Sequence, residues 1–339
     1  MGWSTIDPVR RRRLLLRALA VVLAGAASES AARPPNRTPT PSATSTPRPT
    51  ATAQPSPTAA PPGSVSIILT DPAPGATIDS DRYNVRGTFQ GPANTGVVVN
   101  DRVAYAADGR FALNALPLAA GANAITATAT APDGRSATAS VSVTATRKPP
   151  DLVLNADAAR GLAPLTVTFT YTRTSPWAIN KLYLDFDGDG RDDYRTNRAP
   201  ASVQNTYTQP GLYHPRLTIT DIAGTTVRAD LAIEVASLDA RDALFLSVWD
   251  PMNDALVRGD VATALGYLNA RAREKYGPIF DDLRSDMPGI VASYSRPQRV
   301  STDPEILEYA INRTIDGVNQ IFFVYLLRDA DGVWRLDSM

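Results

Sequence analysis

Between residues 65 and 144, short stretches of alternating apolar and polar residues are separated by turn residues. A period of two predicts β-strands that bury one face, and dipeptides such as Asp108-Gly109 predict tight turns between them. The expected strands are 65–69, 83–89, 97–99, 111–113, 124–130 and 137–144. Short strands spaced this closely are typical of an antiparallel sandwich, which we place at residues 63–147.

The same alternation restarts after Pro149-Pro150 and is clear at 163–169, 182–186 and 217–221. The proline pair marks a boundary because proline has no backbone N–H to donate to a sheet. We therefore expect a second all-β antiparallel sandwich at residues 148–236.

The apolar spacing then changes to a helical period, with one face formed by Leu244, Val248, Met252 and Leu256. Pro251 either kinks this helix or begins a fresh one capped by Asp250. Gly259-Asp260 ends one helix and caps the next, and a third helix is expected near residues 278–287. Strand patterns follow at 290–294, 306–314, 320–328 and 333–336. Helices followed by a meander predict an α+β domain at residues 237–339.

The N-terminal region has the features of an export signal followed by a spacer. Four arginines at 10–13 precede an apolar run that Arg17 interrupts, which predicts a signal peptide or signal anchor at residues 1–32. Residues 33–62 contain ten prolines among Thr, Ser and Ala, and predict a disordered linker. A cleaved signal gives a secreted protein, whereas an uncleaved one anchors the chain in a membrane and displays it at the cell surface. The sequence leaves both open.

Three family resemblances accompany these domains. The segments 108–111, 116–118 and 121–125 resemble those of bacterial immunoglobulin-like domains appended to secreted enzymes and surface proteins. The segments 182–190, 205–213 and 217–221 together resemble a PKD domain, although Leu184 and Asn205 replace the tryptophan and histidine common in that family. The resemblance implies a spacer or a binding module of an extracellular protein.

The C-terminal domain resembles the NTF2-like cone fold. The likeness lies in Gly259-Asp260, Arg271, Tyr276 and the final hairpin at 331–336. Enzymes of that superfamily place a Tyr, an Asp or a His/Asp pair inside the cone, and other members have no known chemistry. Four side chains of this domain are candidates for a cavity or for core positions, namely Tyr276, Tyr294, Tyr309 and Arg313.

The composition limits the classes of function that are possible. The 34 basic and 34 acidic residues balance, so no global field favours nucleic acid. The absence of cysteine excludes disulfides, thiolate metal sites and cysteine nucleophiles. The single histidine, His214, leaves almost nothing for mechanisms that need a His base or two His on a metal. We expect His214 to be a surface residue and predict no catalytic residues.

An acidic segment at 185–193 is the one candidate metal site. Asp185, Asp187, Asp189 and Asp193 fall at the first, third, fifth and ninth places of a calcium loop, with Gly190 at the sharp turn. Thr196 stands where a bidentate Glu would close the shell. The alternative is a β-turn rich in Asp and Gly, with its carboxylates solvated or bonded to turn amides.

These observations favour a non-catalytic extracytoplasmic protein in which the sandwiches present the C-terminal domain to a protein or envelope polysaccharide. The alternative is a small-ligand receptor or vestigial enzyme that uses the NTF2-like cavity. An empty cavity with convergent polar groups would favour the alternative. An interior filled with side chains would favour the first hypothesis. An enzyme that uses Asp and Tyr without His would need two carboxylates or a Tyr/Asp pair converging in the cavity.

Overall fold

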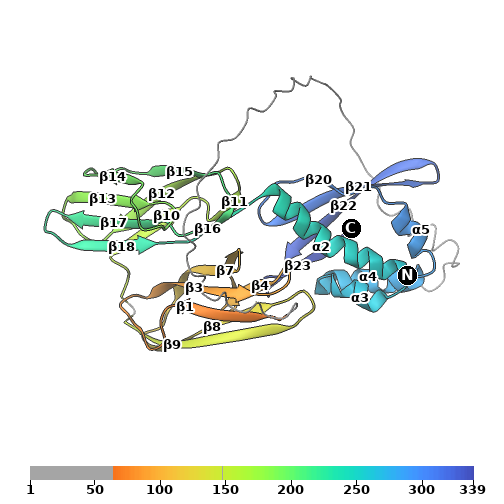
Figure 1. The fold of residues 1–339 in the computed structure, drawn as a ribbon, viewed down its shortest axis with the longest axis horizontal. Coiled ribbons are helices and arrows are strands. Elements are labelled where there is room, and N and C mark those ends of the chain that lie inside the picture. The colour runs from red at the N-terminus through yellow and green to blue at the C-terminus, as the bar shows by residue number, and fades with distance from the viewer. Residues whose placement is uncertain (1–63, 147) are drawn as a thin grey trace, which may run out of the picture. The chain divides into compact units, whose positions relative to one another are not determined.

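The computed structural model describes residues 64–146 and 148–339. The predicted export signal and linker lie outside these residues. Within the described part of the chain, none of the helices combines the length and the apolar character that crossing a membrane requires. Figure 1 shows strands from β1 to β19 followed by helices and a last sheet.

The first domain is the predicted β-sandwich (Figure 1). Its strands are β1 (Ser66–Asp71), β2 (Thr77–Ile78), β3 (Arg82–Gln90), β4 (Gly96–Val99), β5 (Arg102–Val103), β6 (Tyr105–Ala107), β7 (Arg110–Pro117), β8 (Gly121–Thr130) and β9 (Ser136–Ala145). One sheet has the order β1-β3-β7-β6 and the other β2-β9-β8-β4-β5. All neighbours pair antiparallel except β2 and β9, which run parallel.

The period-two pattern explains which face of each strand is buried. In β8, Ile125, Ala127 and Ala129 are fully buried and join the core around Phe111. The intervening threonines face the other side, where Thr126 is hydrogen-bonded to a serine of β9. The apolar face therefore fixes the register, since a slip of one residue would bring the threonines into the core.

The second domain is also a β-sandwich. Its strands are β10 (Leu152–Ala156), β11 (Arg160–Leu162), β12 (Leu165–Arg173), β13 (Ile179–Asp185), β14 (Tyr194–Thr196), β15 (Val203–Tyr207), β16 (Gly211–Tyr213), β17 (Arg216–Asp221), β18 (Thr226–Asp230) and β19 (Ile233–Ala236). They form sheets in the orders β10-β12-β15, β11-β19-β16 and β14-β13-β17-β18. A core that includes Phe169, Leu182 and Ile219 is shared by these sheets.

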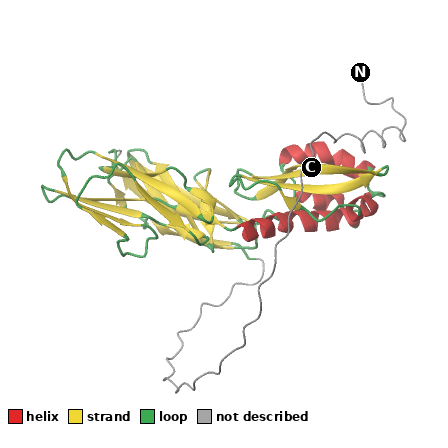
Figure 2. Cartoon of the chain, turned by 90° about the horizontal axis from the view of Figure 1, so that it is seen from above, coloured by secondary structure: helices red, strands yellow, loops and turns green. Residues whose placement is uncertain are grey.

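The third domain is α+β, as predicted, and among the described residues it contains all the helices (Figure 2). Its elements are α2 (Leu238–Val257), α3 (Val261–Gly266), α4 (Ala270–Asp282), α5 (Met287–Ala292), β20 (Gln298–Arg299), β21 (Ile306–Ile315), β22 (Val318–Arg328) and β23 (Trp334–Ser338). The strands form an antiparallel sheet in chain order. The helices and the sheet share one hydrophobic core.

Capping residues determine where the first two helices of this domain begin. Ser237 caps α2 by accepting a hydrogen bond from the backbone of Ala240, and Asp260 caps α3 in the same way. Pro251 lies inside α2, which runs through it as one helix instead of restarting there. The apolar face of α2 packs on the core over its whole length, and this burial outweighs the backbone hydrogen bond that proline removes.

Two predictions in this domain are wrong. The third helix, α4, begins at Ala270 rather than near residue 278, because Asn269 caps it and Ala272, Tyr276 and Phe280 form a buried face across Pro278. The expected strand at 290–294 is helical, since α5 spans Met287–Ala292 with a proline in its first turn. Its β-branched residues resemble a strand locally, but burial of one helix face decides the outcome.

Candidate functional site

The acidic segment forms a tight loop between β13 and β14. Asp185 is 3% exposed, and its two carboxylate oxygens accept hydrogen bonds from the backbone N–H groups of Gly188 (2.6 Å) and Gly190 (2.9 Å). These glycines have φ values of +81° and +92°, which favour glycine over other residues. The Asp-Gly repeat therefore wraps the loop around one buried carboxylate.

The structure brings three of the four predicted carboxylates together. Asp185, Asp187 and Asp193 each place a carboxylate oxygen within 4.8 Å of the others. Asp189 is not in this group, and its Oδ1 accepts a hydrogen bond from the backbone of Arg191 at 2.7 Å. A backbone hydrogen bond from Asp189 acts to lower the pKa of Asp187, but burial and the surrounding carboxylates raise that pKa overall.

A divalent cation would relieve this repulsion. Asp187 and Asp193 are exposed, so their oxygens have lone pairs open to an ion, and carboxylate oxygens are the ligands that Ca²⁺ prefers. Thr196 lies in β14, where it pairs with Leu182 and adds no carboxylate. The hydrogen bonds from turn amides fit the β-turn alternative equally well, so calcium binding stays a prediction.

Calcium is expected to stabilise the chain through this loop. At a concentration about ten times Kd, binding raises the free energy of unfolding by about 1.4 kcal/mol. Thermal unfolding in calcium and in chelator measures this difference. Asp187→Asn should abolish it, whereas Asp189→Asn, the matched control, should retain most of it. An equal response from both variants would place the effect elsewhere.

His214 follows β16 and lies against the same loop. Its backbone N–H donates to the carbonyl of Asp187 at 3.4 Å, and its Nδ1 is buried without a hydrogen-bond partner in the described chain. Burial, followed by the charges of Arg86, Arg110 and Arg216, lowers the pKa of His214 to about 4. The ring is therefore partly buried and neutral, which corrects the expectation of a surface histidine.

This depressed pKa predicts a loss of stability in mild acid. The unfolded chain binds a proton on histidine near pH 6.5, whereas the folded chain binds it only near pH 4. The contribution of neutral His214 is therefore complete above about pH 6.5 and lost as the pH falls through 4. Wild type should lose on the order of 1–2 kcal/mol more than His214→Gln over this window, after allowance for screening of the partly exposed ring.

An NMR titration measures the pKa directly, because the chain has only one histidine. A pKa near 6.5 in the folded protein would remove the basis of this expectation.

A row of aromatic side chains fills the space between α2 and the sheet of the C-terminal domain. Phe245 stacks on Tyr309 with ring centroids 3.7 Å apart and on Trp249 at 5.8 Å. Trp249 in turn contacts Tyr294, again at 5.8 Å. Tyr294 and Tyr309 thus belong to the packed core of this domain, as does Tyr276.

The other two candidates, Tyr276 and Arg313, lie outside this aromatic row. The hydroxyl of Tyr276 donates to the carbonyl of Met339 at 2.6 Å and accepts from its backbone N–H, so it fastens the C-terminal residue. Arg313 Nε and Gln320 Oε1 are both buried without a hydrogen-bond partner in the described chain. The four predicted side chains therefore do not converge on one cavity.

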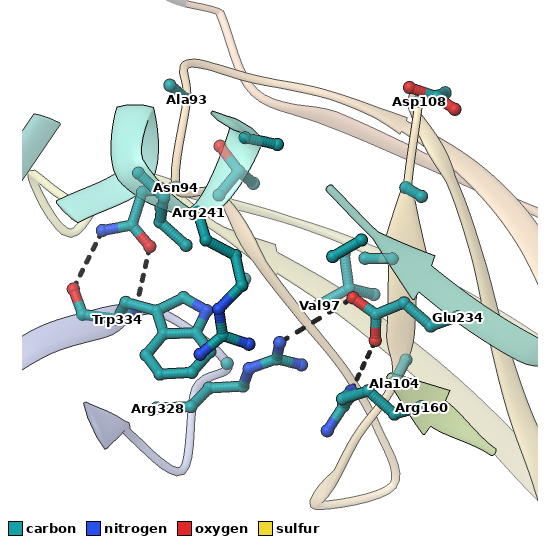
Figure 3. A pocket seen from close by; sticks show the side chains of 18 of the residues that line it. Ala93, Asn94, Val97, Ala104, Asp108, Arg160, Glu234, Arg241, Arg328 and Trp334 are labelled. Carbon is teal, nitrogen blue, oxygen red and sulfur yellow. Dashed lines mark hydrogen bonds and ion pairs between the residues drawn. The ribbon is translucent and has the colours of Figure 1, made fainter. Parts of the chain in front are cut away.

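A cavity of about 290 Å³ lies where residues of all three domains meet (Figure 3). We call it the junction cavity. Its lining is largely apolar and includes Phe89 and Val97 of the first sandwich and Leu244 and Trp334 of the α+β domain. Five charged side chains also line it, namely Asp108, Arg160, Glu234, Arg241 and Arg328.

Ion pairs connect the second sandwich to the α+β domain beside this cavity. Arg160 donates to Glu234 at 2.6 Å and, across the domain boundary, to Glu305 at 2.9 Å. Its guanidinium also lies 4.9 Å from the ring centroid of Tyr105 in the first sandwich. Arg160 therefore contacts all three domains.

The first sandwich contacts the final hairpin through backbone groups. Asn94 donates from Nδ2 to the carbonyl of Trp334 at 2.9 Å and accepts from its N–H at 2.8 Å. Gly96 and Gly332 pack so closely that a Cβ on Gly96 would lie 2.3 Å from the carbonyl carbon of Gly332. This approach requires glycine at position 96.

The two sandwiches are joined in a similar way. Asn114 donates to the carbonyl of Ala232 at 2.9 Å and accepts from its N–H at 2.7 Å. Arg86 forms an ion pair with Asp230, and a small cluster of Ala112, Leu212 and Ala232 is buried beside these contacts.

The residues that line the junction cavity were not predicted from the sequence, because they come from separate segments and form no local motif. One of them has a detectable signal. Arg241 occupies a position on the buried face of α2, four residues before Phe245. A charge at an apolar position indicates a buried partner.

Comparisons with models of known protein families and with curated proteins find no match. Solved structures that match include fibronectin(III)-like modules of CbhA from Clostridium thermocellum, at 14% identity over 51% of this chain and 96% of theirs, with a TM-score of 0.21. A PKD domain of an M14-like peptidase from a Thermoplasmatales archaeon has 20% identity over 25% of this chain and 91% of its own, with a TM-score of 0.20. CopC from Methylosinus trichosporium has 18% identity over 24% of this chain and 95% of its own, with a TM-score of 0.19. The two β-sandwiches rest on the strand pairing, and at these TM-scores the neighbours add nothing about fold or function.

Proposed function

We propose that this chain is a non-catalytic extracytoplasmic modular protein. Its sandwiches, one immunoglobulin-like and one PKD-like, are spacer and binding modules that present an NTF2-like C-terminal domain to a protein or an envelope polymer. The export signal and Pro-rich linker that the sequence predicts support the location, and the absence of cysteine leaves the domains to fold by packing alone.

The contacts between the domains carry this proposal. Asn94 bonds the first sandwich to Trp334, and Arg160 bonds the second to Glu305. A domain held by both sandwiches is fixed in its orientation, because moving it would break the part-buried hydrogen bonds of Asn94, which each contribute about 1 kcal/mol, and the exposed ion pair between Arg160 and Glu305. Spacers with free linkers between modules need none of these contacts.

The interior of the α+β domain supports a non-catalytic role. A Tyr/Asp pair is present there, since the hydroxyl of Tyr309 donates to Asp242. However, the ring of Tyr309 is stacked on Phe245, and Asp242 is also paired with Arg299 at 3.0 Å. Neither partner lines the junction cavity. Both groups are already satisfied, as expected of a core hydroxyl rather than a catalytic one.

Binding of the purified full chain to a panel of envelope polysaccharides and surface proteins tests the proposal. We expect the protein to bind one component of this panel. We also expect it to turn over none of a panel of small substrates. Ile321→Ser changes a side chain that is 54% exposed on the C-terminal domain, and loss of retention in this variant would assign the contact to that domain. Absence of retention on every component, in calcium and in chelator, would contradict the proposal.

A further inference from the structure

Two guanidinium groups at the junction cavity have no carboxylate within hydrogen-bond distance. Arg241 donates three hydrogen bonds to the backbone carbonyls of residues 303, 304 and 306, which carry no formal charge. Arg328 has its nearest carboxylate, Glu234, at 3.8 Å, and its Nε is buried without a hydrogen-bond partner in the described chain. Glu234 is engaged by Arg160 instead, at 2.6 Å.

Both arginines are removed from water. Arg241 is 6% exposed, and the side chain of Arg328 is 15% exposed. Burying a cation without an anion beside it is costly, and in both residues desolvation lowers the pKa below its ordinary value. Arg160 is paired with both Glu234 and Glu305, so the guanidinium groups of Arg241 and Arg328 are the ones on the cavity wall without a close anion.

The rest of the cavity wall is suited to the apolar part of a bound molecule. The guanidinium of Arg328 lies 4.9 Å from the ring centroid of Trp334, and that of Arg241 lies 5.7 Å from it (Figure 3). Val97 and Leu244 add aliphatic surface. The exposed residue Asp108 is also in the lining, so the cavity reaches the protein surface.

We propose that the junction cavity binds a small organic anion, with its carboxylate facing Arg328 and Arg241 and its apolar body against Trp334. Arginine and carboxylate form strong charge-assisted hydrogen bonds, and an anion here would supply the missing negative charge. A volume of about 290 Å³ is at the small end of the range for ligand pockets, which suits a molecule about the size of one aromatic ring. This site lies between domains and is distinct from the interior of the α+β domain.

Calorimetric titration of the full chain with benzoate tests the proposal, with benzamide as the neutral probe of nearly the same shape. We expect one benzoate per chain, a higher melting temperature in benzoate, and no detectable binding of benzamide at the same concentration. Equal binding of the two probes, or no binding of benzoate, would overturn the proposal. Sulfate binding as tight as benzoate would overturn the assignment of an organic anion.

Variants locate the site. Arg328→Gln should weaken benzoate binding at least ten-fold, whereas Arg195→Gln, which changes an arginine with a 67% exposed side chain outside the cavity, should leave it unchanged. Should Arg328→Gln fail to fold, Ala106→Leu fills the cavity with an apolar side chain and should also remove binding. Unchanged benzoate affinity in a folded Arg328→Gln or Ala106→Leu protein would show that the anion binds elsewhere.

Discussion

Replacing Gly96 by valine is expected to detach the first sandwich from the final hairpin while both domains stay folded. A Cβ at position 96 would lie 2.3 to 2.5 Å from three backbone atoms of Gly332, Asp331 and Val333. A change of rotamer cannot relieve a clash with backbone, so the domains must move apart. Valine is favourable within a strand, and β4 itself should therefore persist.

Overpacking of this kind typically costs about 1–3 kcal/mol, and here the loss of both hydrogen bonds between Asn94 and Trp334 adds to it. Small-angle scattering should report a larger radius of gyration, and hydrogen exchange should increase in residues 94–97 and 331–335. The matched control is Gly266→Ala, because a Cβ there meets nothing within 4 Å. Unchanged scattering and exchange in Gly96→Val would mean that the contact does not hold the domains together.

The features that were predictable from the sequence are those set by local pattern. Alternation located the main strands of both sandwiches, because one buried face per strand repeats every second residue. It did not predict the short strands β2, β5, β6, β11 and β14, nor β10, β18 and β19. The acidic loop was also visible, since its aspartates and glycines lie within nine residues. The helix α4 was misplaced because Pro278 suggested a beginning, whereas burial of Tyr276 and Phe280 carries the helix through it.

The junction cavity was not predictable for a different reason. Arg160, Glu234 and Arg328 are far apart in the sequence and meet only after the second sandwich and the α+β domain have folded and docked. None of them lies in a motif, and each resembles an ordinary surface charge when viewed alone. What distinguishes them is burial at a domain boundary, which depends on contacts such as that between Gly96 and Gly332 rather than on local spacing.

Phe245→Ala is expected to produce the largest loss of stability in the C-terminal domain. Phe245 is fully buried, and its ring lies between those of Tyr309 and Trp249 in the aromatic row. Truncating a buried phenylalanine costs about 3–5 kcal/mol, because both transfer energy and packing are lost. The opening free energy of α2, measured by hydrogen exchange, should fall by this amount.

The matched control is Phe323→Ala, which removes the same atoms from a side chain that is 41% exposed on β22 and should cost about 1 kcal/mol or less. The comparison tests whether the interior is filled or open. A ring that lined an open ligand cavity would already lack contacts on one side, so its removal would cost little more than removal of Phe323. A small difference between the stability losses of the two variants would therefore favour the receptor hypothesis. A difference of several kcal/mol supports a structural role for the aromatic row.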